Sequence, residues 1–490
     1  MKTNINLPTI IQGGMGVAIS NWQLARSVSR LGQLGVVSGT GIGRVLASRL
    51  GDGDLGGHMR RALESFALPE PVQNIIKRYY VPGGKAPNEP YKSPPMYSIR
   101  PPKLLDQLTA IANYVEVFLA KESHHGIVGI NLLEKVQMPN LSSLYGAMLA
   151  GVDYVLMGAG IPTQVAAVLD KLANHEAVSY RLDVYGAGPD EEVRMHFDPE
   201  NIFPGISRLV GQLKRPKFLP IISSTVLAQA LLKRGDGAID GFVVEGPTAG
   251  GHNAPPRGAL KLNEKGEPLY SEKDCVTPEK MRQFGLPFWM AGGYGHPEQV
   301  QAALEAGATG VQVGTAFALC NESGLEASLK ERLLRQVLDE DANVLTSALV
   351  SPTGFPFKVA QLAGTLSEVA LYEARQRICD MGFLRTIFKK EDGAVGYRCA
   401  AEPVDDYVRK GGKEEDTVGR SCLCNNLAAT AGYPQQRKDG STELPLVTAG
   451  DDLASVVQFV RAGQTTYSAA DVIDYLLGPL GKRTTATVNA

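Results

Sequence analysis

The chain has 490 residues, of which 44% are hydrophobic and 20% charged, so it is able to bury a large core. Its formal net charge of −2 gives no overall field that would draw it to nucleic acid or anionic lipid. No apolar run of about 18 residues is present to cross a membrane. The segment MKTNINLPTIIQGGMG lacks the regions of a signal peptide, and we expect a cytoplasmic protein without nucleic-acid or membrane partners.

Short apolar runs alternate with helical patterns along the chain. The runs are rich in β-branched residues and apolar almost throughout, which is typical of parallel strands buried on both faces. We predict strands at Thr9–Gln12, Leu34–Ser38, Ile127–Asn131, Tyr154–Met157, Phe218–Ile222, Gly241–Glu245, Pro287–Met290 and Gly310–Val313. Helices with a capping residue or an early proline are predicted at Asn21–Leu31, Pro162–Asn174, Thr225–Arg234 and Pro297–Ala306.

This alternation predicts an α/β fold, a closed (β/α)₈ TIM barrel, more than an open sheet. The alternative that some short apolar runs are helical stays open. We assign the barrel to residues 1–365, with inserts at about 43–125 and 177–215. The first insert contains the proline-rich KAPNEPYKSPPMYSIRPPK, which favours an extended loop, and the second reads as a hairpin. Residues 366–490 are predicted to form a mostly helical extension that contains four cysteines.

His252 is the strongest candidate for a catalytic residue. It follows a predicted strand in EGPTAGGH, where Gly250 and Gly251 leave room beside the imidazole for a flat cofactor or substrate. Histidine ordinarily titrates near neutrality, so it is suited to removing or returning a proton. A purely structural histidine at the barrel rim is the alternative.

Two glycine-rich turns come at the ends of the last two predicted strands. In MAGGYG and GVQVGTAF, the backbone amides of Gly292, Gly293, Gly314 and Thr315 are placed to face a phosphate. Many barrels hold a phosphorylated cofactor at this position. Tight turns without a ligand are the alternative interpretation.

Polar residues or glycines also lie at the carboxyl ends of most of the remaining predicted strands. They are Gln12–Gly16, Ser38–Thr40, Asn131, Ser223 and Ser224. Each one is a plausible turn residue by itself, but together they suit the edges of a bound heterocycle.

Four of the six cysteines lie close together in the extension: Cys379, Cys399, Cys422 and Cys424. Four thiolates are able to hold zinc or an iron–sulfur cluster, although the C-x-C spacing of the last pair is tighter than the usual C-x₂-C. The alternative is a set of buried, reduced thiols. A disulfide framework is not expected in a cytoplasmic chain.

The ordered motifs IIQGGMGVAIS, GINLL, EGPTAGGH, MAGGYG and GVQVGTAFAL resemble the nitronate monooxygenase (2-nitropropane dioxygenase) family, which shares its fold with flavin-dependent enoyl-acyl carrier protein reductases. The resemblance covers about residues 7–365 and implies an FMN-binding barrel in which His252 is catalytic. It implies FMN contacts at Gly13, Gly14, Met15, Asn131, Gly292, Gly293, Gln312, Gly314 and Thr315. Ser223, Gly250 and Gly251 complete the cofactor residues that we predict.

The resemblance also implies a reaction. A nitronate gives its electrons to FMN, the flavin reacts with O₂, and a carbonyl compound and nitrite result. His252 would first remove the α-proton of a neutral nitroalkane. The sequence departs from the family at AGGHNAPPRG, where Asn253–Pro256 moves Arg257 away from His252, and in its inserts and extension. The resemblance therefore predicts the substrate less well than it predicts the fold and the cofactor.

Two other functions stay open. An NAD(P)H-dependent FMN reductase of an enoyl thioester or quinone shares the fold and needs no G-x-G-x-x-G motif. A barrel without catalytic activity is a further alternative, although intact glycine turns beside His252 argue against it. A metal-dependent hydrolase is set aside because no H-x-H motif is present. The expected partners are a small-molecule substrate and O₂ or NAD(P)H, and a homo-oligomer is compatible with the sequence.

Overall fold

Eight parallel strands form the centre of the computed structural model, which describes residues 7–188, 190–461 and 463–486. The strands run in the spatial order β1-β11-β10-β9-β8-β4-β3-β2. They are β1 (Ile10–Gln12), β2 (Gly35–Ser38), β3 (Val128–Leu133), β4 (Tyr154–Gly158), β8 (Lys217–Ile222), β9 (Phe242–Glu245), β10 (Phe288–Ala291) and β11 (Gly310–Val313). All of them lie at the positions that the sequence predicts.

The sheet closes on itself between β1 and β2. The amide of Gln12 donates to the carbonyl of Leu34 at 3.0 Å, and the amide of Leu34 donates to the carbonyl of Ile10 at 3.1 Å. With β11 bonded to the other side of β1, no open edge remains between the first and last strands. The predicted TIM barrel is therefore confirmed.

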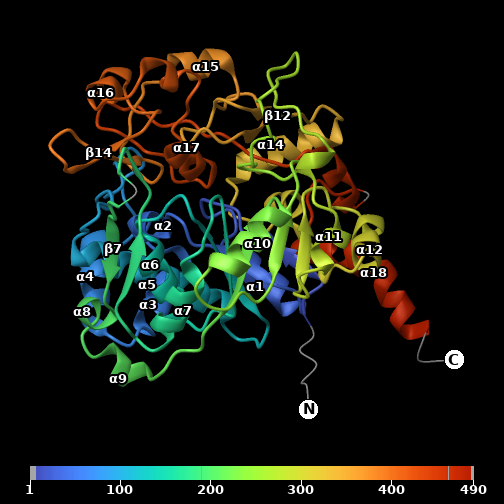
Figure 1. The fold of residues 1–490 in the computed structure, drawn as a ribbon, viewed down its shortest axis with the longest axis horizontal. Coiled ribbons are helices and arrows are strands. Elements are labelled where there is room, and N and C mark those ends of the chain that lie inside the picture. The colour runs from blue at the N-terminus through green and yellow to red at the C-terminus, as the bar shows by residue number, and fades with distance from the viewer. Residues whose placement is uncertain (1–6, 189, 462, 487–490) are drawn as a thin grey trace.

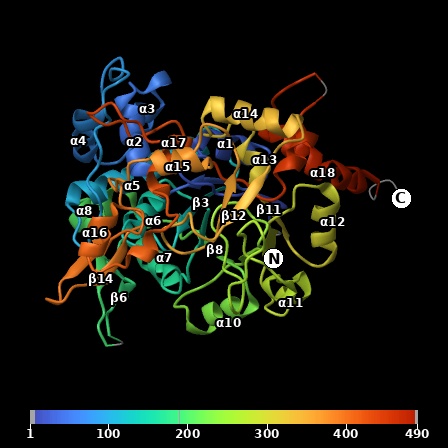
Figure 2. The ribbon, with the colours of Figure 1, turned by 90° about the horizontal axis from the view of Figure 1, so that it is seen from above.

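Helices surround the strands, as Figure 2 shows from above. They are α1 (Trp22–Arg30), α5 (Lys103–Lys121), α6 (Asn140–Leu149), α7 (Val165–Ala173), α10 (Thr225–Arg234), α11 (Pro278–Arg282), α12 (Pro297–Glu305), α13 (Thr315–Ala318) and α14 (Ala327–Leu338). Local signals fix several of their starts. Ser224 caps α10 by accepting from the amide of Leu227 at 3.1 Å, and Pro297 occupies the first turn of α12.

Alternate residues of the strands fill the inside of the barrel. Val36, Leu219 and Trp289 belong to one buried cluster although they come from strands that are not neighbours. The indole of Trp289 donates to the carbonyl of Pro8 at 2.7 Å. The residues that alternate with these along the strands, such as Val37 and Phe288, point outward and belong to the larger core beneath the helices. Burial on both faces explains the near-continuous apolarity of these strands.

The inserts of the barrel contain regular structure of their own. The first holds α2 (Ile42–Gly51), η1 (Leu55–Gly57), α3 (His58–Glu64), α4 (Pro69–Tyr79) and α5, and its proline-rich segment is an extended loop as predicted. In the second, β5 (Val178–Arg181) pairs antiparallel with β7 (Arg194–Phe197), which confirms the predicted hairpin. It also holds β6 (Val184–Tyr185), α8 (Pro199–Ile202) and α9 (Ile206–Val210).

The closest helix contact of the barrel involves Gly146 of α6. A Cβ at this position would lie 1.9 Å from the carbonyl oxygen of Ala110 on α5. We expect Gly146→Ala to lower the free energy of unfolding by about 1–3 kcal/mol, because the two backbones must separate. Urea unfolding measures the loss. Gly478→Ala, at an exposed position with open space, is the control, and equal stability of both variants would contradict the prediction.

The segment after the barrel is coloured orange to red in Figure 1: its orange part lies above the strands, whereas its red C-terminal helix lies beside α12. It follows a hairpin of β12 (Val344–Ser347) and β13 (Phe357–Ala360) that the sequence analysis did not predict. Its elements are α15 (Val369–Ala374), β14 (Thr386–Lys389), β15 (Val395–Arg398), α16 (Val404–Arg409), η3 (Glu414–Thr417), α17 (Leu423–Thr430), η4 (Leu453–Phe459) and α18 (Ala469–Ala486). β14 pairs with both β15 and β6, which joins this segment to the second insert. Residues 1–6 and 487–490, the outer ends of the predicted domains, lie outside the described part. Among the described helices, none has the length and apolarity needed to cross a membrane.

Candidate functional site

A cavity of about 600 Å³ opens at the carboxyl ends of the barrel strands. The segment after the barrel covers it with Leu423, Thr448 and other residues. Every residue that the sequence analysis assigned to catalysis or cofactor binding lines this cavity: His252, Gly13, Gly14, Met15, Asn131, Ser223, Gly250, Gly251, Gly292, Gly293, Gln312, Gly314 and Thr315. The structure thus brings them to one place, and their individual roles stay predictions.

His252 is held by the β12–β13 hairpin. Its Nε2 lies 2.7 Å from the hydroxyl of Ser351, and its ring packs edge-on against Phe357 with 4.8 Å between centroids. The backbone on both sides of His252 is fixed as well. The backbone amide of Lys358 donates to the carbonyl of Gly251, and the backbone amide of Asn253 donates to the carbonyl of Pro356, each at 2.9 Å. The imidazole is therefore positioned by a segment that is distant in sequence.

The ionisation of His252 differs from the sequence-based expectation. Burial lowers its pKa well below the usual value, and the positive charge of Lys135 lowers it further. The imidazole is consequently uncharged at neutral pH and does not titrate near neutrality. At neutral pH the imidazole can accept a hydrogen bond, and it can accept a proton only transiently.

Several polar atoms of the cavity wall have no protein partner. The side-chain oxygens of Thr40, Asn131, Asn253 and Gln312 are buried and form no hydrogen bond with the described residues. Leaving such an atom unsatisfied costs about 1–3 kcal/mol, so these positions favour a ligand that carries hydrogen-bond donors. A flavin ring has both donors and acceptors on its edge, and the wall fits such a group.

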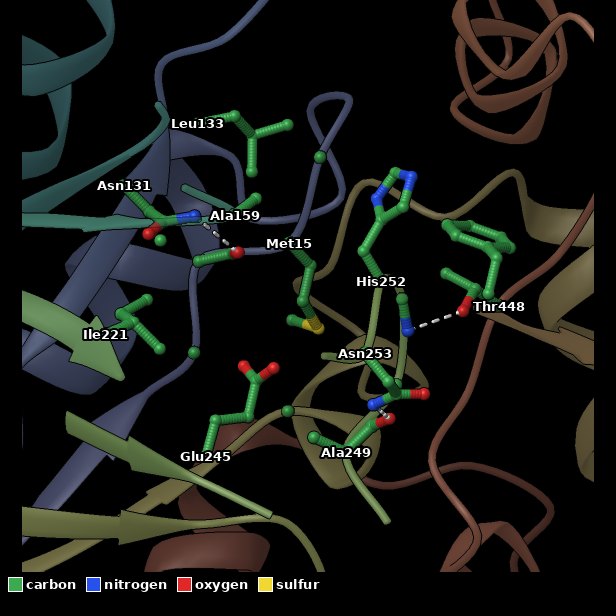
Figure 3. Close-up of a pocket in the computed structure, with 18 of the residues that line it drawn as sticks. Met15, Asn131, Leu133, Ala159, Ile221, Glu245, Ala249, His252, Asn253 and Thr448 are labelled. Carbon is green, nitrogen blue, oxygen red and sulfur yellow. Dashed lines mark hydrogen bonds between the residues drawn. The ribbon is translucent and has the colours of Figure 1, made fainter. Parts of the chain in front are cut away.

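Close packing of Gly14 shapes the same wall. A Cβ at Gly14 would lie 2.2 Å from the Cβ of Asn131, and the amide of Asn131 donates to the carbonyl of Gly14 at 3.1 Å (Figure 3). Only glycine lets the loop after β1 come this near to β3. The result is a flat surface at the first and third strand ends.

The predicted phosphate end of the cavity contains a carboxyl group that the sequence analysis missed. Asp452 is hydrogen-bonded to the side chain of Thr315, and burial raises the pKa of this carboxyl. The hydroxyl of Thr315 also accepts from the amide of Gly450 at 2.9 Å. The segment around Gly450 thus packs directly against the turns that follow β10 and β11.

The four cysteines of the extension lie in a buried apolar cluster. Cys399, Cys422 and Cys424 pack there with Cys379 at its border, and Cys424 also reaches the cavity. The neighbouring thiols, followed by burial, raise the pKa of Cys379 and Cys424. In the described part of the chain, no group of three or more His, Cys, Asp or Glu side chains is arranged to hold a metal ion. The predicted zinc or iron–sulfur site is therefore not seen.

Three charged residues near the cavity were missed as candidates. Glu245 ends β9 directly before the glycine-rich loop, so its strand-end position was a usable signal. Lys135 lies beyond β3 in NLLEK, and an isolated lysine in such a loop gives no local signal. Asp452 reaches the cavity through tertiary packing alone.

The closed barrel defines a TIM-barrel protein, and its cavity lies at the face where such barrels usually bind their ligands. Residues 208–352 match the family model described as nitronate monooxygenase. This segment contains EGPTAGGH, MAGGYG and GVQVGTAFAL, so the family resemblance of these motifs is confirmed. Residues 208–352 thus resemble a family of oxidoreductase enzymes.

Curated relatives are similar over parts of the chain. A probable nitronate monooxygenase from Bacillus subtilis is 35% identical over 26% of this chain and 34% of its own length. The nitronate monooxygenase of Pseudomonas aeruginosa is 35% identical over 28% of this chain and 37% of its own. The alignments thus span about a third of these relatives. A carboxyl-CoA dehydrogenase of Mycobacterium tuberculosis, acting on an octahydroindene, is 29% identical over 40% of this chain and 50% of its own length.

Two solved structures resemble the whole chain at low identity. FabK from Thermotoga maritima has a TM-score of 0.46 at 15% identity, over 98% of this chain and 94% of its own. Nitroalkane oxidase from Streptomyces ansochromogenes has a TM-score of 0.47 at 16% identity, over 98% of this chain and 97% of its own.

Proposed function

We propose that this protein is an FMN-dependent oxidoreductase that oxidises a small nitronate or a related carbon acid with O₂. The observation that carries the proposal is one cavity in which His252, the glycine turns and the unpartnered oxygens of Asn131 and Gln312 meet. The family match of residues 208–352 supports the same reaction.

The residues of the cavity suggest how FMN would be held. The amides of the turns at Gly292–Gly293 and Gly314–Thr315 suit its phosphate, and Asn131 and Gln312 suit the edge of its ring. Bound FMN would supply two-electron oxidation of the substrate and the subsequent reaction with O₂. The covering segment, including Leu423, limits access of bulk water to the cavity.

His252 would handle the proton of the substrate. A nitronate is already deprotonated, whereas a neutral nitroalkane must first lose its α-proton, and His252 is the base for that step. Because the pKa of His252 is low, the imidazolium formed must lose its proton again before the next turnover.

A second candidate is an NAD(P)H-dependent FMN reductase of an enoyl thioester or quinone. The carboxyl-CoA dehydrogenase among the relatives favours it, as do apolar residues of the cavity wall such as Leu333, Leu427 and Val447. These residues suit a longer acyl chain better than they suit a small nitro compound.

Anaerobic mixing separates the two functions. The purified protein, loaded with FMN, is mixed with an alkyl nitronate or with NADH, and the flavin absorbance is followed. Rapid bleaching by the nitronate supports the first proposal, and rapid bleaching by NADH alone supports the second. A colourless protein that takes up no FMN would refute both.

Asp452 gives the proposal a test by pH. Since burial already raises its pKa, a phosphate at Thr315 would favour the protonated carboxyl still more. We expect FMN to bind more weakly as pH rises through this pKa, and Asp452→Asn to bind FMN about tenfold more tightly at high pH. Fluorescence titration of the apoprotein measures both. Asp341→Asn, at an exposed carboxylate outside the cavity, is the control, and identical affinity of the wild type and Asp452→Asn across pH would contradict the prediction.

A further inference from the structure

Glu245 places a carboxyl group inside the cavity that the proposed function does not use. It ends β9, and Figure 3 shows its carboxyl pointing into the space between Ile221 and Met15. The imidazole of His252 lies on the other side of Met15 in the same view. No hydrogen bond from the described residues reaches the carboxyl oxygens, so the group is free to bind a ligand or a proton.

Lys135 lies behind the cavity wall, and its ammonium group also has no hydrogen-bond partner among the described residues. Its Nζ is buried, forms no hydrogen bond with the described residues, and lies 4.2 Å from the ring centroid of Phe355, a residue of the wall. Its positive charge acts on both Glu245 and His252. Glu134 is the other carboxyl that acts on Lys135, and it is bonded to Gln137 and Tyr180.

The charges explain how each group ionises. Burial raises the pKa of Glu245 to about 7, although the charge of Lys135 opposes the shift. Burial lowers the pKa of Lys135 to about 7, although the negative charges of Glu245 and, to a smaller extent, Glu134 oppose this shift. Of the titratable groups facing one another here, Glu245 and Lys135 change charge near neutrality, whereas His252 stays neutral. A group with a pKa near the working pH is the most efficient proton acceptor.

We propose that Glu245 is the terminal proton acceptor of the cavity, and that Lys135 is a positioning residue that keeps Glu245 ionised. The inference rests on the proposed function. His252 takes the α-proton of a neutral nitroalkane, so that the C–H bond breaks and its electron pair stays on the nitronate. Because Met15 lies between the two groups in Figure 3, a water molecule of the cavity relays the proton: the imidazolium N–H bond breaks, an O–H bond forms on the carboxylate of Glu245, and His252 returns to its neutral form. The proton leaves to solvent after the product.

Opposite substitutions of Lys135 test the pairing. The carboxylate is the active form, so kcat/KM for a neutral nitroalkane should fall as pH drops below about 7. Lys135→Met removes the cation, which raises the pKa of Glu245 and should move this midpoint up by about one pH unit. Lys135→Arg keeps a permanent charge and should move the midpoint down. A purely structural role would not shift the two profiles in opposite directions.

Glu245→Gln tests the acceptor itself. It should lower kcat/KM for the neutral nitroalkane about 100-fold and abolish the acidic limb, while oxidation of the preformed nitronate changes only a few-fold. Retained FMN content and circular dichroism show that the variant folds. An unchanged pH profile in Glu245→Gln, or shifts in the same direction for both Lys135 variants, overturns the inference.

An infrared pH titration separates this inference from the proposed function. The band of the protonated carboxyl should have a midpoint near pH 7, be absent in Glu245→Gln, and move in opposite directions in the two Lys135 variants. This result would support the pairing even in a protein that oxidises no nitronate, where the proposed function fails. Absence of such a band at any pH in the wild type would refute the pairing even if nitronate turnover is normal.

Discussion

His252→Asn is expected to retain FMN and its yellow colour but to lose turnover of a neutral nitroalkane by roughly 10²–10⁴-fold. Asparagine replaces the imidazole with a group of similar size that cannot accept the α-proton. It preserves a polar side chain facing Ser351, which at present lies 2.7 Å from Nε2, so the hairpin should stay in place. Steady-state kinetics and flavin absorbance measure the two effects on one preparation.

The control for this variant is His196→Asn, because His196 is exposed on β7 and outside the cavity. It should behave as the wild type in both measurements. Unchanged turnover of the neutral nitroalkane in His252→Asn would remove His252 from the mechanism. Loss of FMN together with activity would instead make His252 a cofactor-binding residue.

Gly314→Val is expected to weaken FMN binding about 10- to 100-fold without destabilising the apoprotein. Gly314 has φ of −109°, which other residues readily adopt, and a Cβ there would meet only Met15 Sδ, at 3.9 Å. Because Gly314 lines the cavity, the added side chain is expected to occupy the space where the phosphate is proposed to bind. Fluorescence titration with FMN and thermal unfolding of the apoprotein measure the two properties.

Gly478→Val is the matched control, because this exposed glycine of α18 also has open space around it. It should bind FMN as the wild type does. If Gly314→Val binds FMN with unchanged affinity, the phosphate does not lie at the turn after β11. A large loss of apoprotein stability would show that the turn itself needs glycine.

The barrel strands were predictable because both their faces are buried. Runs such as Gly310–Val313 are apolar at nearly every position, and the polar or glycine residues after them mark the carboxyl ends of the strands. The helix at Thr225–Arg234 was predictable for a similar reason, since its cap and its amphipathic pattern are local. Because alternating strands and helices give parallel strands, the carboxyl ends of all the strands were expected at one face of the barrel.

The β12–β13 hairpin was not predictable in the same way. Its strands are short, and Lys358 is buried in the second one, although the charge of a lysine predicts an exposed position. The Nζ of Lys358 bonds to Thr346 at 2.7 Å and to Asp451 at 2.6 Å, so its burial depends on partners distant in sequence.

The sequence by itself determined the barrel, the face on which the cavity opens and the strand-end residues assigned to it, because these follow from local periodicity and from the ends of parallel strands. The tertiary structure decided the charge state of the site. Burial of His252 keeps its imidazole neutral, and Lys135 and Glu245 change charge near neutral pH because they share one poorly solvated region. Desolvation and the distance between charges depend on packing from separate segments, and no local pattern encodes them.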